Sequence, residues 1–258
     1  MSTTSSVRLK RDRNQIFDES GICDVCGALT VYTFENIINE TLARQWRLNR
    51  TQRHAMSSRE SMKCIFCGCS YRLRLLARAL NYWLYGTGDK SLAENIQIHD
   101  SITNTAKVAE INSCGVLHEV LKSYKKLSYS EFGPDKNGEI PHQDIQALTY
   151  QSASFEVVLT SDVLEHVPDV KKALMEVHRV LKVGGAFIFT IPVVRGRKTT
   201  LRTTHKDKET VYIRQPSYHG SGEDDYLVWT EFGDDTPELF EKHGFEVIEP
   251  FISDADES

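Results

Sequence analysis

The chain has 258 residues, of which 40% are hydrophobic and 26% charged, and its formal net charge is -5. This length suffices for one α/β domain with a small additional module. No apolar run is long enough to span a bilayer, and the first residues lack the apolar segment of a secretory signal, so we expect a cytoplasmic protein without membrane contact.

Charge is distributed unevenly along the chain. Residues 1–90 carry 14 Lys and Arg against 8 Asp and Glu, whereas the remainder carries 17 against 28. This asymmetry suggests two modules. The basic module could contact nucleic acid or an acidic partner. The alternative, which we favour, is that its arginines form the solvent-exposed face of a helix and pair with acidic residues of the rest of the chain. We favour it because few aromatic residues are interleaved with the arginines.

The first ninety residues are predicted to form a tail and a small module. Residues 1–19 are expected to be a flexible tail, and residues 20–90 a cysteine-rich module. Within the module, apolar residues recur with partly helical spacing over residues 34–53 and with clear helical spacing over residues 72–85. The sequence GTGDK at residues 86–90 should break that second helix.

Two cysteine pairs bracket this module. Cys23 and Cys26 form one CxxC motif, and Cys64 and Cys67 form another. Two such pairs can place four thiolates around one tetrahedral ion, which predicts a structural zinc site without an open position for substrate. The alternative is four unrelated reduced cysteines. Cys69 is a candidate substitute ligand, whereas Cys114 is expected to be a small buried or loop residue.

From residue 91 to residue 258, strand patterns alternate with helix patterns. Helices are predicted at 116–126, 168–182 (with Pro168 at its first position and Gly184-Gly185 ending it) and 237–243. Strands are predicted at 107–111, 127–131, just before Asp144, and at 155–160, 186–192 and 245–248. The alternation predicts an α/β fold, with a doubly wound, mostly parallel sheet.

The run DIQALTYQSASFEVVLTSDVLEHVPDVKKALMEVHRVLKVGGAFIFTIP, at residues 144–192, resembles the second half of a class I S-adenosylmethionine (SAM)-dependent methyltransferase, a Rossmann-like family. The resemblance implies SAM as methyl donor. It also implies that the ribose hydroxyls bind to Glu131 and that the adenine amino group faces Asp144 and the amide of Ile145. The other implied cofactor-binding residues lie at strand ends: Glu110, Asn112, Gly115, Phe132, Ser161, Asp162 and His166.

The loop after the first strand departs from that family. Only Gly115 remains of the usual glycine pattern, although Asn112 can adopt a left-handed conformation. This departure leaves open a non-catalytic, zinc-stabilised adaptor that has lost SAM binding. Elsewhere, QPSYHGS at residues 215–221 and the sequence SEF around Glu131 are similar to a bacterial methyltransferase subgroup that also carries paired CxxC motifs.

The predicted function is O-methylation of a small-molecule or saccharide hydroxyl. This reaction needs a base, and His219 and His166 are the candidate catalytic residues. Each histidine also has a structural interpretation. His166 would then only pack beside the cofactor, and His219 would be a structural residue of its loop. His219 lies in a long insertion, residues 194–231, that is expected to cap the acceptor. The alternative is an RNA or protein methyltransferase that uses the basic N-terminal module, so a nucleic-acid partner stays open but is not favoured.

Overall fold

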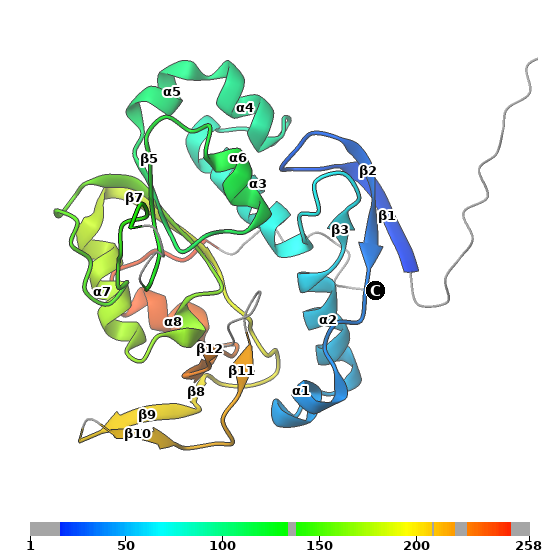
Figure 1. Ribbon diagram of the computed structural model, residues 1–258, viewed down its shortest axis with the longest axis vertical. Helices are drawn as coiled ribbons and strands as arrows, with labels where there is room; N and C mark the ends of the chain where they lie inside the picture. Colours follow the sequence, from blue (N-terminus) through cyan, green and yellow to red (C-terminus); the bar gives the residue numbers. More distant parts are fainter. Residues whose placement is uncertain (1–15, 134–137, 208, 220–225, 249–258) are drawn as a thin grey trace, which may run out of the picture.

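A computed structural model describes residues 16–133, 138–207, 209–219 and 226–248 (Figure 1). Its N-terminal part is a three-stranded antiparallel sheet in the order β1-β2-β3. The strands are β1 (Ile16–Ile22), β2 (Leu29–Phe34) and β3 (Lys63–Cys64). Residues 1–15 of the expected tail lie outside the described residues, and residues 16–19, which we also assigned to the tail, belong to β1 instead.

Two short helices separate β2 from β3. They are α1 (Glu40–Gln45) and α2 (Arg50–Glu60), and each begins at an asparagine whose side chain accepts a hydrogen bond from a first-turn amide. Three further helices follow: α3 (Tyr71–Tyr85), α4 (Leu92–Ile98) and α5 (Asp100–Thr105). Gly86 ends α3 in the left-handed conformation (φ 69°), which confirms the predicted break.

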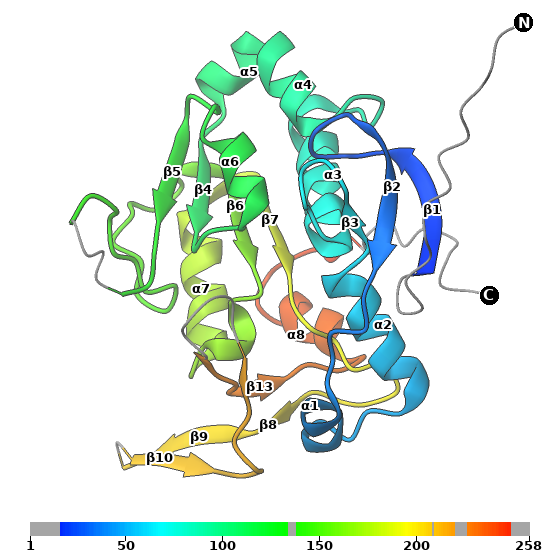
Figure 2. The ribbon, with the colours of Figure 1, turned by 45° about the vertical axis from the view of Figure 1, so that its right-hand side comes forward.

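The central sheet has four parallel strands in the order β5-β4-β6-β7, which confirms the predicted α/β fold (Figure 2). The strands are β4 (Val108–Ile111), β5 (Leu127–Ser130), β6 (Phe155–Ser161) and β7 (Leu181–Thr190). Three helices accompany them: α6 (Val116–Leu121), α7 (Val170–Val180) and α8 (Thr236–Glu241). A 3-10 turn, η1 (Leu164–His166), follows β6.

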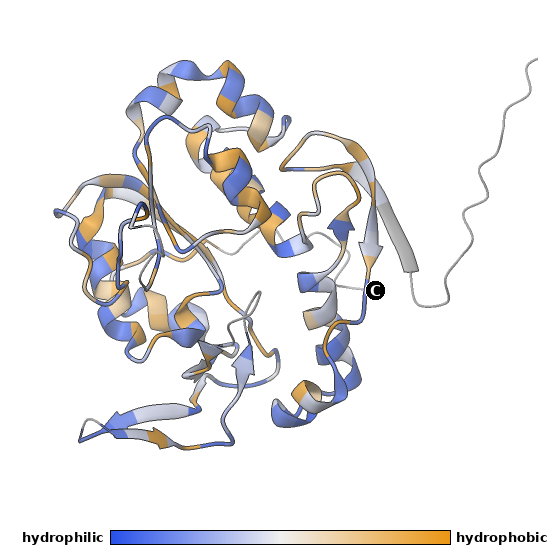
Figure 3. Cartoon of the chain, viewed as in Figure 1, coloured by the Kyte–Doolittle hydropathy of each residue, from blue (hydrophilic) through white to orange (hydrophobic). Residues whose placement is uncertain are grey.

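Each face of this sheet packs into its own apolar core. Val108 and Val157 point into a core formed with α3, α6 and the cysteine-rich strands, whereas Ala109 and Val158 point into a core formed with α7 and α8. Hydrophobic residues accordingly concentrate on α3 and α7 (Figure 3). The first core contains residues from both predicted modules, so the N-terminal part and the sheet are packed as one body.

Corrections are needed for the helix predicted at 168–182, for the glycines expected to end it and for the strand predicted at 245–248. α7 begins after Asp169 rather than at Pro168 and ends at Val180. Gly184 and Gly185 lie instead in a bulge of β7, where a Cβ on Gly185 would come within 3.0 Å of backbone oxygens. Residues 245–248 form no strand, and the structure shows none beyond β13 in the described C-terminal residues.

The strand that we predicted just before Asp144 is reduced to a single bridge. Glu131 and His142 pair in parallel at the outer edge of β5. The strands of the following insertion do not extend the central sheet. Thr210–Tyr212 instead lie in a hairpin with the preceding strand.

The insertion after β7 consists of short strands at the carboxyl ends of the sheet strands (Figure 2). They are β8 (Thr200–Leu201), β9 (Thr203–Lys206), β10 (Glu209–Tyr212), β11 (Tyr218–His219), β12 (Tyr226–Leu227) and β13 (Thr230–Glu231). Val194 and Val228 of this insertion pack with Trp46, which follows α1, in a third small core. Within the described residues, no helix has both the length and the apolar composition needed to cross a membrane.

Candidate functional site

The loop after β4 has a conformation that depends on particular residues. Asn112 adopts the left-handed conformation (φ 61°) that its residue type allows, and its Oδ1 accepts a hydrogen bond from the Phe132 amide at 2.9 Å. Gly115 has φ 59° and ψ -129°, a combination that is open essentially to glycine alone. Glu110 is fully buried beneath the loop and accepts hydrogen bonds from the Cys114 amide (2.8 Å) and from Nδ1 of His118 (2.6 Å). The loop therefore keeps its bend with fewer glycines.

Glu131 lies beside this loop, at the end of β5. Its Oε1 accepts a hydrogen bond from the Ser113 amide at 3.0 Å and another from the Tyr129 hydroxyl. A carboxylate retains further lone pairs, so Glu131 can also accept from a ligand hydroxyl. The neighbouring Phe132 side chain is 57% exposed. Glu131 therefore stands at the junction of the two strand ends, where ligands of open parallel sheets bind.

Asp144 and Ile145 lie after the single bridge that follows β5. Oδ1 of Asp144 accepts hydrogen bonds from the amide of Gln146 (2.9 Å) and from its side chain (3.2 Å). Gln146 in turn accepts a hydrogen bond from the Asp169 amide at 2.9 Å, which ties this segment to the start of α7. Ile145 is buried in the core beneath the segment. Asp144 is thus held in a fixed turn.

Asp162, directly after β6, is surrounded by cationic side chains from the N-terminal part. Arg59 of α2 donates to it at 2.8 Å, and Nε of Arg72 of α3 lies 3.3 Å from it. Thr190 donates a third hydrogen bond at 2.9 Å, and Ser161 accepts one from Arg72. Burial alone would raise the pKa of Asp162, but the two guanidinium groups hold it well below its usual range. These contacts hold α2 and α3 against the carboxyl ends of the sheet strands.

His166 and His219, which lie far apart in the sequence, come together at this edge. Their ring centroids are 4.7 Å apart in an edge-to-face arrangement. Glu165 is fully buried beside them, and neither of its carboxyl oxygens has a hydrogen-bond partner among the described residues. One ligand-type atom from each of these three side chains lies within 4.8 Å of the others. The group can exchange protons, and groups of this type can also ligate a divalent cation.

Burial sets the charge of this group. It lowers the pKa of His219 to about 4, an effect that the neighbouring His166 reinforces, and it also lowers the pKa of His166. Burial and nearby Asp162 raise the pKa of Glu165 well above its ordinary value. Both imidazoles are therefore neutral near pH 7, and a neutral imidazole has a free nitrogen lone pair for a proton.

Two tryptophans lie beside the group formed by Glu165, His166 and His219. The Trp46 ring lies 5.8 Å from the His219 ring, and the Trp46 indole donates a 2.8 Å hydrogen bond to Ser217 of the insertion. Trp229 donates its backbone amide to the Glu165 carbonyl at 2.7 Å. The insertion and the N-terminal part therefore cover the carboxyl edge of the sheet from two sides.

The four cysteine thiols are also brought together. The Sγ atoms of Cys23 and Cys67 are 3.7 Å apart, those of Cys26 and Cys64 are 3.9 Å apart, and one sulfur from each of the four lies within 4.8 Å of the others. Tetrahedral zinc with Zn–S bonds of about 2.3 Å requires sulfurs about 3.8 Å apart, so the arrangement fits that ion. Cys69 is buried nearby but is not part of the group.

Comparison with known proteins identifies a domain in the central part of the chain. Residues 107–189 match the family model of a methyltransferase domain. This segment is less than half of the chain, and it includes most of the site residues described above.

Two curated relatives are similar over part of the chain. The arsenite methyltransferase of Mus musculus is 29% identical over 135 residues, which are 51% of this chain and 35% of that protein. The arsenite methyltransferase of Rattus norvegicus is 33% identical over 87 residues, 32% of this chain and 24% of that protein. The chain thus spans about a third or less of the length of these relatives.

A solved S-adenosylmethionine-dependent methyltransferase from Mesorhizobium loti is weakly similar, with 15% identity and a TM-score of 0.34. The similarity covers 56% of this chain and 76% of that one.

Four residues of the site did not emerge from the sequence: Arg59, Arg72, Glu165 and Trp46. The basic surplus of residues 1–90 was the available signal for the arginines, and their pairing with Asp162 agrees with the expected pairing between the basic and acidic halves. Trp46 carried no signal, because its role depends on a contact with a segment far along the chain.

Proposed function

We propose that the protein is a SAM-dependent methyltransferase that methylates a hydroxyl group of a small molecule or saccharide. The observation that supports this most directly is the meeting of His166 and His219 at the carboxyl edge of a sheet whose sequence matches a methyltransferase domain. A hydroxyl acceptor has to lose its proton, and a neutral histidine at that edge can accept it.

The residues of the strand ends fit the cofactor. Asn112 and Gly115 give the loop after β4 the bend that lets its backbone approach a ligand. Glu131 offers acceptor oxygens to ribose hydroxyls, and Asp144 with the Ile145 amide would face the adenine. Ser161, Asp162 and Phe132 line the same edge. The bent loop favours SAM binding over the alternative of an adaptor that has lost it.

When bound, SAM supplies a methyl group that is already activated on a sulfonium. The protein therefore has to align the acceptor, exclude water and remove one proton. We assign the proton to His219: with the donor bound, an imidazole nitrogen of His219 would accept the proton of the acceptor hydroxyl as its oxygen takes the methyl group. His166, whose Nδ1 lies 3.1 Å from the Leu227 carbonyl, supports the His219 ring from its edge.

The four thiols are proposed to hold one structural zinc ion. Cys23 and Cys64 are buried in the core that also contains α3 and the central sheet. Zinc at this place would stabilise the part of the molecule that supplies Arg59, Arg72 and Trp46. Its contribution to function would be to keep these residues in position, because four thiolates leave no open coordination site for substrate.

Two measurements test this function. Calorimetry with SAM and S-adenosylhomocysteine should show saturable binding, and its absence in zinc-replete protein would favour the non-catalytic adaptor. Transfer of a labelled methyl group to a panel of saccharides, small hydroxylated compounds, RNA and protein should then label the small molecules. Labelling of RNA or protein alone would contradict the small-molecule acceptor.

A further inference from the structure

A pocket of about 190 Å³ lies between the end of α1 and the insertion, and Trp46 lines it. Both segments contribute to it, so it exists only because the N-terminal part packs on the insertion. Its lining consists of Arg44, Gln45, Trp46, Arg47, Arg202, Ile213, Arg214 and Gln215, and we call it the arginine pocket. Four of these eight residues are arginines, and none is acidic.

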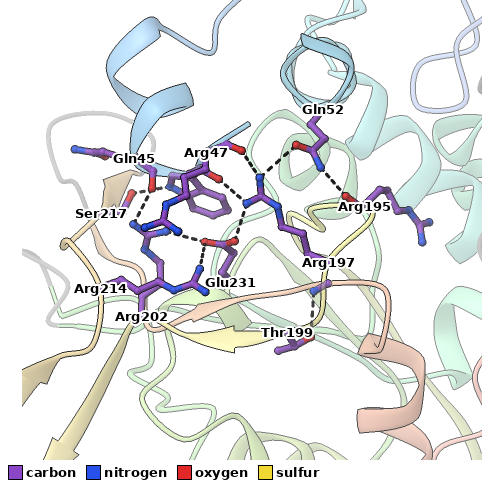
Figure 4. Close-up of polar contacts among 12 residues, drawn as sticks. Gln45, Arg47, Gln52, Arg195, Arg197, Thr199, Arg202, Arg214, Ser217 and Glu231 are labelled. Atoms are coloured by element: carbon purple, nitrogen blue, oxygen red, sulfur yellow. Dashed lines mark hydrogen bonds and ion pairs between the residues drawn. The ribbon is translucent and has the colours of Figure 1, made fainter. Parts of the chain in front are cut away.

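The buried floor of the arginine pocket is cationic. Arg202 is 1% exposed, and it donates to Glu231 at 2.7 Å and to the Gln215 carbonyl at 2.9 Å (Figure 4). Its Nε has no hydrogen-bond partner among the described residues. A buried donor without a partner costs free energy, and an acceptor atom that reached it would relieve this cost.

Glu231 does not neutralise this charge. Its carboxylate is 2% exposed and lies near three guanidinium groups: Arg202 at 2.7 Å, Arg197 at 3.2 Å and Arg214 at 3.5 Å (Figure 4). One negative charge thus faces three positive ones. The cluster keeps a net positive charge, and such a surplus at a partly enclosed site favours an anion.

Part of this cluster has a purely structural role. Arg197 donates to the carbonyl oxygens of Trp46 (2.6 Å) and Arg47, and Arg202 reaches the Gln45 carbonyl at 3.4 Å. These guanidinium groups donate hydrogen bonds to carbonyl oxygens at the end of α1, where no further helical amide is available to donate to them. Arg197 and Arg202 are therefore needed to join the two segments.

The side chains of Arg44 and Arg47 are not needed for that joint. Both are exposed and line the pocket, and neither side chain makes a hydrogen bond or ion pair with another described residue. The Arg214 guanidinium lies 3.5 Å from the Glu231 carboxylate, the longest of the three distances given above. Three guanidinium groups thus retain most of their donors, and arrays of guanidinium donors match the oxygens of phosphate in particular.

We infer that the arginine pocket binds a phosphoryl group carried by the methyl acceptor. This inference rests on the proposed function and narrows the acceptor to a phosphorylated small molecule. Trp46 lines the pocket and its ring lies 5.8 Å from that of His219, so one aromatic side chain separates the phosphoryl group from the base. The anion would anchor one end of the acceptor while its hydroxyl reaches His219.

The test is calorimetric titration of the zinc-replete full chain with inorganic phosphate and with pyrophosphate, without SAM. Arg47→Gln and Arg214→Gln should each weaken binding by about tenfold, since each removes charge-assisted hydrogen bonds. The matched control is Arg50→Gln, which removes an exposed arginine that does not line the pocket. Thermal melts should show that all three variants stay folded.

The inference would be overturned by no phosphate binding at tens of millimolar, by equal binding to the two pocket variants and the wild type, or by acetate binding as tightly as phosphate. A short RNA bound more tightly than pyrophosphate, and weakened equally by Arg50→Gln, would also overturn it and assign the basic residues to a nucleic-acid surface. Failure of SAM binding with intact phosphate binding would contradict the proposed methyltransferase instead.

Discussion

The indole nitrogen of Trp46 donates a 2.8 Å hydrogen bond to the hydroxyl of Ser217, and both side chains are buried. This bond joins the end of α1 to the insertion, at the point where the Trp46 ring also lies 5.8 Å from the His219 ring. The N-terminal part and the insertion are thus directly coupled around the proposed base.

Trp46→Phe tests this coupling. The substitution keeps an aromatic ring but leaves the Ser217 hydroxyl without its donor, which should lower the free energy of unfolding by about 1–3 kcal/mol. Urea denaturation measures the change. Trp83→Phe is the control, because Trp83 lies on α3 and is 42% exposed. Equal unfolding free energies for the wild type and Trp46→Phe would show that the bond does not stabilise the contact.

The cysteine group gives a prediction about metal content. Purified protein should contain about one zinc per chain, and Cys23→Ser or Cys64→Ser should lose it and lower the melting temperature. Cys69→Ser is the matched control, since Cys69 is buried nearby but does not belong to the group of four thiols. Elemental analysis measures the zinc. Wild-type protein without zinc, or loss of zinc from Cys69→Ser alone, would contradict the proposed ligand set.

Much of the fold was predictable because it depends on local patterns. Apolar, β-branched runs predicted β6 and β7, and helical spacing predicted α3 and α7. The left-handed Asn112 followed from a residue type that tolerates this conformation. The strand prediction for residues 245–248 was wrong, because a short apolar run indicates that a segment is buried but does not specify that it pairs with a neighbouring strand. Phe245 is in fact packed against the core beside α7.

The site was predictable only in part, because its side chains meet through tertiary packing. The sequence indicated His166 and His219 separately, and their 4.7 Å contact depends on the path of the insertion. The bonds of Arg59 and Arg72 to Asp162 join residues about a hundred positions apart, and no local pattern encodes such a pair. Glu165 belonged to the recognised motif, but its burial without a partner depends on the fold.

Glu131→Ala tests the proposed ribose contact. Loss of charge-assisted hydrogen bonds worth about 1.5–3 kcal/mol should weaken SAM binding by about ten- to a hundredfold. Glu119→Ala is the control, since Glu119 is exposed on α6 and pairs only with Lys122 among the described residues. Calorimetry with S-adenosylhomocysteine measures both. An unchanged dissociation constant in folded Glu131→Ala would show that the ribose is held elsewhere.

His219→Ala tests the proposed base. Turnover should fall by about two to four orders of magnitude, while SAM affinity stays nearly unchanged, because the substitution removes only the proton acceptor. His205→Ala is the control within the same insertion; His205 is exposed, and its ring contacts that of Trp229 in a tilted arrangement. A rise in the acceptor's KM without loss of turnover would indicate a structural role. Turnover that requires an added divalent cation would assign His219 to metal ligation instead.

The pH dependence provides an independent test of His219. Burial and the adjacent His166 lower its pKa from the ordinary 6.5 to about 4, so His219 stays neutral and able to accept a proton well below pH 6. The acid limb of kcat/KM, which reports the free enzyme, should therefore lie near pH 4 and be absent from the residual activity of His219→Ala. An acid limb near 6.5 that persists in His219→Ala would identify a different, solvated base.

The same shift predicts how stability responds to pH. The unfolded chain binds a proton at this position below about pH 6.5, whereas the folded protein does so only near pH 4. The contribution of neutral His219 is therefore fully present above pH 6.5 and is lost as the pH falls towards 4. Urea titrations at several pH values should show this loss in the wild type and a smaller loss in His219→Asn, which cannot titrate. Identical pH dependences would mean that His219 is solvated in the folded protein, which would remove the reason for its neutrality and for its assignment as the base.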